Sequence, residues 1–227
     1  MGGIRIQGTF MPCALLLASI CTSGCRSTTS LDLAHNSYIY ASPGYKAPRR
    51  TESPVFVQRI LDQRKPPHFS DRASLKQQFP DNVWERPIPV MLEDVLLDEI
   101  DRSEIYNGIS SGSAGVPGRR DIVVEPTLHA LYRYREAMLG GEHFGKRRSG
   151  AYVALRLRVM SPLDAHGKRE ILLDKVFQDL VLTDLGRGRP EQGVVLAGMA
   201  LQNIMRQVMP ALYQSNIRAI PGAPVKK

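Results

Sequence analysis

The segment "AYVALRLRVM" at residues 151–160 alternates apolar and basic side chains, and it constrains the fold more than any other stretch. On a strand, alternate residues point to opposite faces, so Arg156 and Arg158 would lie opposite the apolar set. That apolar set comprises Val153, Leu155, Leu157 and Val159. A sheet covered by helices on both faces has continuous apolar strands instead. The pattern therefore predicts a mostly antiparallel sheet with one buried face and one partly wet face.

The spacing of apolar residues predicts the other strands and helices. Strands are expected at 53–61, 121–136 and 170–182, besides the one at 151–160. The turn sequence "DAHGKR" at 164–169 should join the strands at 151–160 and 170–182 as a hairpin. An amphipathic helix is expected at 88–103, and a last helix after residue 190 should be kinked or ended by Pro210. The order β-α-β-β-β-α predicts a single α+β domain with two helices packed on one face of the sheet. The acidic residues of the first helix are expected on its solvated side: Glu93, Asp94, Asp98, Glu99 and Asp101.

The N-terminus carries a short apolar run, "FMPCALLLASIC" at 10–21, behind Arg5. About 12 residues are too few to cross a bilayer, which needs roughly 20. A basic start, a short apolar core and small residues after it are typical of a secretory signal peptide. The step Ser23-Gly24-Cys25 resembles the bacterial lipoprotein signal, although Thr22 departs from the usual Leu, Val or Ile. Two interpretations stay open: a lipidated Cys25, or a plain secretory signal cut near Gly24.

The chain is thereby divided into four parts. Residues 1–24 are predicted to be the lipoprotein signal peptide, 25–52 a lipidated cysteine with a flexible tether, 53–214 the α+β domain, and 215–227 a loose tail. The tether is predicted because residues 26–53 are rich in Ser, Thr, Pro and Arg and have no period, so they would bury little surface. The segment 107–120, "NGISSGSAGVPGRR", is a loop by composition.

No set of residues suggests catalysis or a cofactor. The three cysteines all lie within the first 25 residues, which argues against a disulfide framework or a thiolate zinc site in the body. The five histidines are scattered, so no metal is expected. The Gly-rich stretches match neither a phosphate-binding loop nor a dinucleotide fingerprint, and no nucleophile elbow occurs. The sequence thus predicts a protein that is not an enzyme, binds no cofactor and acts by binding a partner.

Charge suggests where that partner binds. The formal net charge is +8, which favours an acidic protein face or anionic lipid. The export signal argues against nucleic acid. The loop "GKRRSG" at 145–150 and basic residues on neighbouring strands are expected to form one basic face. The predicted partner-binding residues are Lys146, Arg147, Arg148, Arg133, Arg135, Arg156 and Arg158.

The layout resembles the ABC-type transport auxiliary lipoproteins, which serve lipid-transport systems with an MCE component. The resemblance rests on the lipoprotein-like signal, the element order, the helix start "VWERPIPVMLEDVLLDEI" and the hairpin "DAHGK" at 164–168. It implies a non-enzymatic lipoprotein, anchored in the outer membrane and facing the periplasm. Arg26 agrees with that location, because it is not the Asp that commonly retains such proteins at the inner membrane. The order is also similar to lipoproteins that activate peptidoglycan synthases, so an activator or scaffold of a cell-wall synthesis or secretion complex is the alternative.

Overall fold

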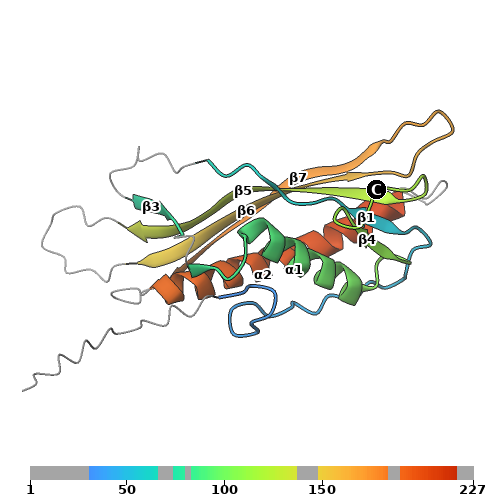
Figure 1. Ribbon diagram of the computed structural model, residues 1–227. Coiled ribbons are helices and arrows are strands. Elements are labelled where there is room, and N and C mark those ends of the chain that lie inside the picture. Colours follow the sequence, from blue (N-terminus) through green and yellow to red (C-terminus); the bar gives the residue numbers. More distant parts are fainter. Residues whose placement is uncertain (1–30, 66–73, 80–82, 137–147, 184–189, 219–227) are drawn as a thin grey trace, which may run out of the picture.

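The computed structural model describes residues 31–65, 74–79, 83–136, 148–183 and 190–218. They form one seven-stranded sheet with both helices on the same face, so the predicted α+β class is confirmed (Figure 1). The helices are α1, Ile88–Ser103, and α2, Pro190–Arg218. The strands are β1 (Val55–Val57), β2 (Leu61–Asp62), β3 (Ser74–Gln78), β4 (Ile109–Ser111), β5 (Ile122–Glu136), β6 (Ser149–Met160) and β7 (Ile171–Thr183).

Three long strands, β5, β6 and β7, form the antiparallel part of the sheet, and β7 is its edge. Along the other edge of β5 lie β1 and β2, which run parallel to it, and β3, which runs antiparallel. The strand β4 pairs in parallel with the far side of β1. The sequence-based order missed β2, β3 and β4, and the predicted loop 107–120 contains β4. Strands of two to five residues are too short to show a period, so neighbours along β5 determine them.

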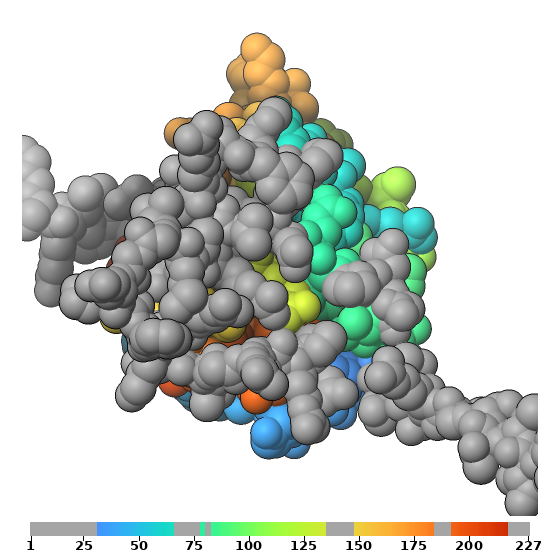
Figure 2. Space-filling model, turned by 90° about the vertical axis from the view of Figure 1, so that its left-hand side faces the viewer, coloured from blue at the N-terminus to red at the C-terminus, as the bar shows by residue number. Residues whose placement is uncertain are grey.

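The hairpin predicted between β6 and β7 is present. The Asp164 carboxylate accepts hydrogen bonds from the backbone N–H groups of His166 and Lys168, at 2.8 and 2.7 Å. Gly167 has a φ of +72°, a backbone conformation that side chains with a Cβ rarely adopt. This turn closes the hairpin that rises above the rest of the molecule (orange, top of Figure 2).

Both helices pack their apolar stripes on the sheet. The bounds of α1 agree with the predicted 88–103, and Pro89 occupies the first turn, where a missing N–H costs no helical hydrogen bond. Of the two outcomes predicted at Pro210, an end of the helix does not occur, because α2 continues past it to Arg218. Ser215 and Asn216 are buried there, so the predicted loose tail is wrong for residues 215–218. Residues 219–227 lie outside the described part.

A segment of residues 31–51, here called the strap, lies across the helices on the side away from the sheet (blue, Figure 1). Three of its side chains are buried in the hydrophobic core: Leu33, Ile39 and Tyr40. A Cβ on Gly198 of α2 would lie 1.9 Å from the Ile39 carbonyl oxygen, so only glycine permits this crossing. At the strap's end, Asn216 donates a hydrogen bond to the Thr51 hydroxyl at 2.7 Å. The predicted flexible tether is therefore wrong for residues 31–51, because the strap supplies apolar side chains to the core, and residues 25–30 lie outside the described part.

Two acidic residues of α1, Glu93 and Glu99, are buried rather than solvated. Glu99 is 1% exposed, and the Tyr40 hydroxyl of the strap donates a 2.7 Å hydrogen bond to it. Burial, together with this carboxylate, raises the pKa of the Tyr40 phenol well above its usual range. The expected solvated face of α1 is thus wrong at Glu99, because the strap packs against that side of the helix, and at Glu93, because the chain around β4 covers it.

Candidate binding surface

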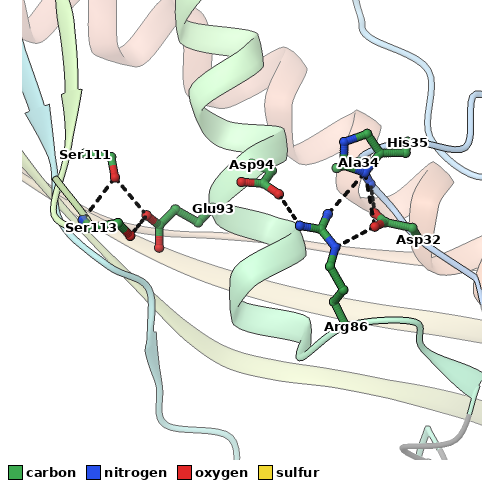
Figure 3. Close-up of polar contacts among 8 residues, drawn as sticks. All are labelled: Asp32, Ala34, His35, Arg86, Glu93, Asp94, Ser111 and Ser113. Carbon is green, nitrogen blue, oxygen red and sulfur yellow. Dashed lines mark hydrogen bonds and ion pairs between the residues drawn. The ribbon is translucent and has the colours of Figure 1, made fainter.

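Two polar clusters lie on α1, and both join segments distant in sequence (Figure 3). In the first, the Arg86 guanidinium donates to Asp32 Oδ2 of the strap and to Asp94 Oδ2 of α1, each at 2.7 Å. Burial alone would raise the pKa of Asp32, but hydrogen bonds from Arg86, His35 and the Ala34 N–H outweigh it and hold that pKa well below its usual range. This cluster fastens the start of the strap to α1.

The second cluster fastens the chain around β4. The hydroxyls of Ser111 and Ser113 each donate to Glu93 Oε1 at 3.2 Å (Figure 3). The Ser111 hydroxyl also accepts a hydrogen bond from the Ser113 N–H. Each group in the two clusters is occupied in holding one segment against another, so we assign both clusters to structure.

The face of the sheet turned away from α1 and α2, here called the outer face, is the main surface left open by the helices (Figure 1). Its side chains follow from the register of the three long strands. Thr127, Arg156 and Val176 form one row across the strands, and Tyr132, Tyr152 and Leu180 form another. Because cross-strand neighbours on one face interact, each row acts as a unit. The rows differ in character between the two ends of the sheet.

The end near the β6–β7 hairpin is charged. Its members are Glu125, Arg156, Arg158 and Asp174, here called the charged half. Arg156 makes two 2.7 Å hydrogen bonds to the Asp174 carboxylate, and its guanidinium holds the pKa of that carboxyl below its usual value. Arg158 lies 3.6 Å from Glu125 Oε2. Two of the predicted partner-binding arginines are therefore neutralised by carboxylates on adjacent strands.

A β-bulge separates Arg133 from the arginines of the charged half. The register between β5 and β6 shifts between Leu128 and Ala130, so the alternation of β5 reverses there. Arg133 consequently aligns with buried Ala151 and approaches α2, where its Nε lies 3.1 Å from a Cβ built on Gly193. The prediction that Arg133 shares one basic face with Arg156 and Arg158 is wrong, because the sequence pattern did not reveal the bulge.

The structure describes only some of the remaining residues that were predicted to bind a partner. Arg148 is exposed just before β6. Lys146 and Arg147 lie outside the described residues, as does Cys25, and the side chain of Arg135 is not described either. The basic loop and the lipidation site therefore stay predictions.

The other end of the outer face is apolar and aromatic. It is here called the aromatic half: Tyr132, Tyr134, Tyr152, Leu180 and Leu182. The rings of Tyr132 and Tyr152 are stacked with centroids 4.9 Å apart, and the Tyr152 hydroxyl donates to Gln178 Oε1 at 2.6 Å. Leu180 and Leu182 are 42% and 38% exposed. Burial raises the pKa of both stacked tyrosines above that of a free phenol, which is itself neutral at physiological pH.

Gly150 shapes this half. A Cβ at Gly150 would lie 2.4 Å from the Val181 carbonyl oxygen and 2.7 Å from Leu182 Cδ2. The glycine therefore leaves room for the Leu182 side chain against β6. The sequence alone assigned no functional role to the tyrosines of this half. The signal available in the sequence was the presence of tyrosines on two strands expected to pair. The sequence did not reveal the bulge that brings Tyr132 beside Tyr152.

Two further observations concern the described residues only. No helix among them has both the length and the apolar character needed to cross a membrane. No group of three or more His, Cys, Asp or Glu side chains there is placed to hold a metal ion.

Comparison with known proteins gives the fold alone. No family model and no curated protein matches the chain. A crystal structure from Xanthomonas campestris, described as belonging to family DUF330, matches with a TM-score of 0.53 and 10% identity, covering 79% of this chain and 95% of that one. A neuraminyllactose-binding hemagglutinin homolog from Helicobacter pylori matches with a TM-score of 0.52 and 9% identity, covering 80% and 93%. The whole domain thus has the fold of known bacterial proteins.

Proposed function

We propose that this chain is a non-enzymatic, lipid-anchored protein of the bacterial cell envelope that serves as an auxiliary component of an ABC-type lipid-transport system. Cys25 would carry the anchor, and the domain would face the periplasm from the outer membrane. Three lines of support come from different parts of the chain: the signal-like N-terminus, the resemblance of the sequence layout, and the bacterial proteins that share the fold.

The aromatic half of the outer face is the observation that carries a binding role. Tyrosine and leucine side chains gather there on paired strands, and two of them are more than a third exposed. Tyrosine is enriched in protein interfaces because its ring is apolar while its hydroxyl remains hydrogen-bonded. The charged half already pairs its charges internally, so it offers less to a partner. We therefore assign the docking of the transport partner to the aromatic half.

Isolation of the full-length chain from its own envelope in mild detergent tests this proposal. The permease, the ATPase and the MCE subunit should copurify with the wild-type chain. Tyr132→Ser combined with Tyr152→Ser should reduce their recovery at least tenfold. The matched control, Arg156→Gln with Asp174→Asn, removes an outer-face pair without changing net charge and should retain them. Recovery of a cell-wall synthase in place of the transport subunits would favour the alternative and overturn the proposal.

The anchor is tested separately by labelling cells with a palmitate analogue. The wild-type chain should incorporate label and fractionate with the outer membrane, whereas Cys25→Ala should do neither. Equal labelling of the two chains, or recovery of the wild type mainly with inner-membrane markers, would contradict this part of the proposal.

A further inference from the structure

β7 has a free edge and carries several exposed apolar side chains. β7 ends the strand order β4-β1-β5-β6-β7, and no described strand pairs with its other side over 13 residues. Ile171, Val176, Leu180 and Leu182 are 49%, 44%, 42% and 38% exposed. They make up four of the nine large apolar side chains that are well exposed among the described residues. An edge that is long and apolar favours pairing with another strand.

The sequence of β7 lacks the usual features that prevent such pairing. It contains neither proline nor glycine. Its charges on the helix side are Lys175, whose Nζ lies 4.9 Å from the Phe177 ring centroid, and Asp179, which accepts a hydrogen bond from Asn203 of α2 at 2.9 Å. Inward-pointing charges commonly oppose edge pairing. Here, however, they have opposite signs and lie two residues on either side of Phe177.

We propose that two copies of the chain pair through their β7 edges, antiparallel and centred on Phe177, to form one continuous sheet. In this register Lys175 of each copy lies opposite Asp179 of the other. On the helix side, Leu173 also lies opposite Val181, and on the outer face Val176 lies opposite Gln178 and Asp174 opposite Leu180. On its helix side, the strand therefore complements itself in both charge and apolar character.

Neighbouring registers are worse. A shift by one residue would place side chains of one copy opposite those of the wrong face. Centring on Val176 would set Lys175 against Phe177 and Asp179 against Leu173. Centring on Gln178 would set Lys175 against Val181 and Asp179 against Phe177. The register centred on Phe177 is the one of these three that pairs both charges.

The helix beside the edge supports the same contact. Asn203 of α2 touches Asp179 of β7, and Met199 lies one helical turn before Asn203 on that side of α2. Met199 is 47% exposed. Met199 of α2 therefore lies beside the exposed apolar side chains of β7. This is expected if α2 as well as β7 contacts the second copy.

Cysteine cross-linking of the full-length chain in its envelope tests the register. Val176→Cys combined with Gln178→Cys should give a disulfide-linked dimer of the chain on a non-reducing gel. Each single substitution, the unsubstituted chain, and Val176→Cys with Leu180→Cys should give little, because no matched cysteines then face each other. Absence of the dimer from the first pair, or equal dimer from the last, would overturn the register.

Charge reversal tests the pairing without cysteines. In mild detergent the wild-type chain should have twice its single-chain protein mass by light scattering. Lys175→Glu or Asp179→Lys alone should raise the dissociation constant about tenfold, because two attractive cross-strand pairs become repulsive. The double reversal should restore the wild-type constant. A wild-type chain that stays monomeric at micromolar concentration, or a double reversal no better than the singles, would contradict the proposal whatever partner the aromatic half binds.

Discussion

The two faces of the central sheet are made from the same three strands, yet they differ in almost every physical respect. The face toward the helices is closed twice, first by α1 and α2 and then by the strap, and residues such as Leu155, Leu157 and Phe177 are 1% exposed or less there. The outer face keeps Leu180 and Leu182 in contact with water. Because apolar burial drives folding, the covered face determines stability, and the outer face is left available for a partner.

The largest expected effect is on the covered face, at the crossing of the strap and α2. Gly198→Val should lower the free energy of unfolding by about 3 kcal/mol, because even its Cβ would overlap the Ile39 carbonyl oxygen. Gly115→Val is the matched control, since a Cβ there meets nothing within 4 Å. Denaturant titration of both variants measures the difference. Equal stability of the two would mean that the strap does not pack on α2 as described.

The next effect is the fastening of the strap through Asp32. Asp32→Asn should cost about 2 kcal/mol at neutral pH, because Arg86 loses a charged hydrogen-bond partner on the strap. The folded-state pKa of Asp32 lies below its unfolded value, so its contribution is present above the ordinary carboxyl pKa near 4 and is lost as pH falls. The difference between wild type and Asp32→Asn should therefore shrink from about pH 6 to about pH 3. A difference that grows on acidification would contradict the assignment.

A smaller effect is expected at the buried Glu99. Tyr40→Phe removes the hydroxyl that donates to its carboxylate and should cost about 1.5 kcal/mol. Tyr38→Phe is the control, because Tyr38 is 81% exposed. Thermal or denaturant unfolding should separate the two variants. Similar midpoints would show that another group replaces the Tyr40 hydroxyl.

Prediction from the sequence was accurate where apolar residues recurred at a regular spacing over a long, uninterrupted stretch. The bounds of α1, the hairpin at Asp164 and the apolar face of β6 all follow from spacing and turn chemistry. It failed where tertiary contacts decide. The strap has no period of its own, and its order comes from contacts with helices far away in the chain, such as Ile39 on Gly198.

The candidate surface was harder to predict than the fold. The bulge after Leu128 reverses the alternation of β5, which moves Tyr132 to the outer face and Arg133 to the covered one. Arg156 and Arg158 were placed correctly on the outer face, but their carboxylate neighbours come from strands whose register the sequence does not specify. Charge content alone therefore suggested a basic face that the arrangement of the strands divides and neutralises.

The smallest expected effect is at the charged half. Arg156→Gln with Asp174→Asn should leave the unfolding midpoint almost unchanged, because an exposed ion pair gains little over its hydrated, separate charges. Because the Arg156–Asp174 pair contributes so little, screening it with added salt should hardly change the unfolding midpoint of the wild type. A marked loss of stability in the double variant would show that the charged half contributes to folding in the way the covered face does.

The central claim is that the partner binds the aromatic half of the outer face. The most direct measurement places a photo-crosslinking amino acid at Leu180 or at Asp174, positions on the same face of β7 in the two halves. After irradiation of growing cells, position 180 should form adducts with a subunit of the transport system, and position 174 should form few. Adducts with that subunit from position 174 and none from position 180 would contradict the account.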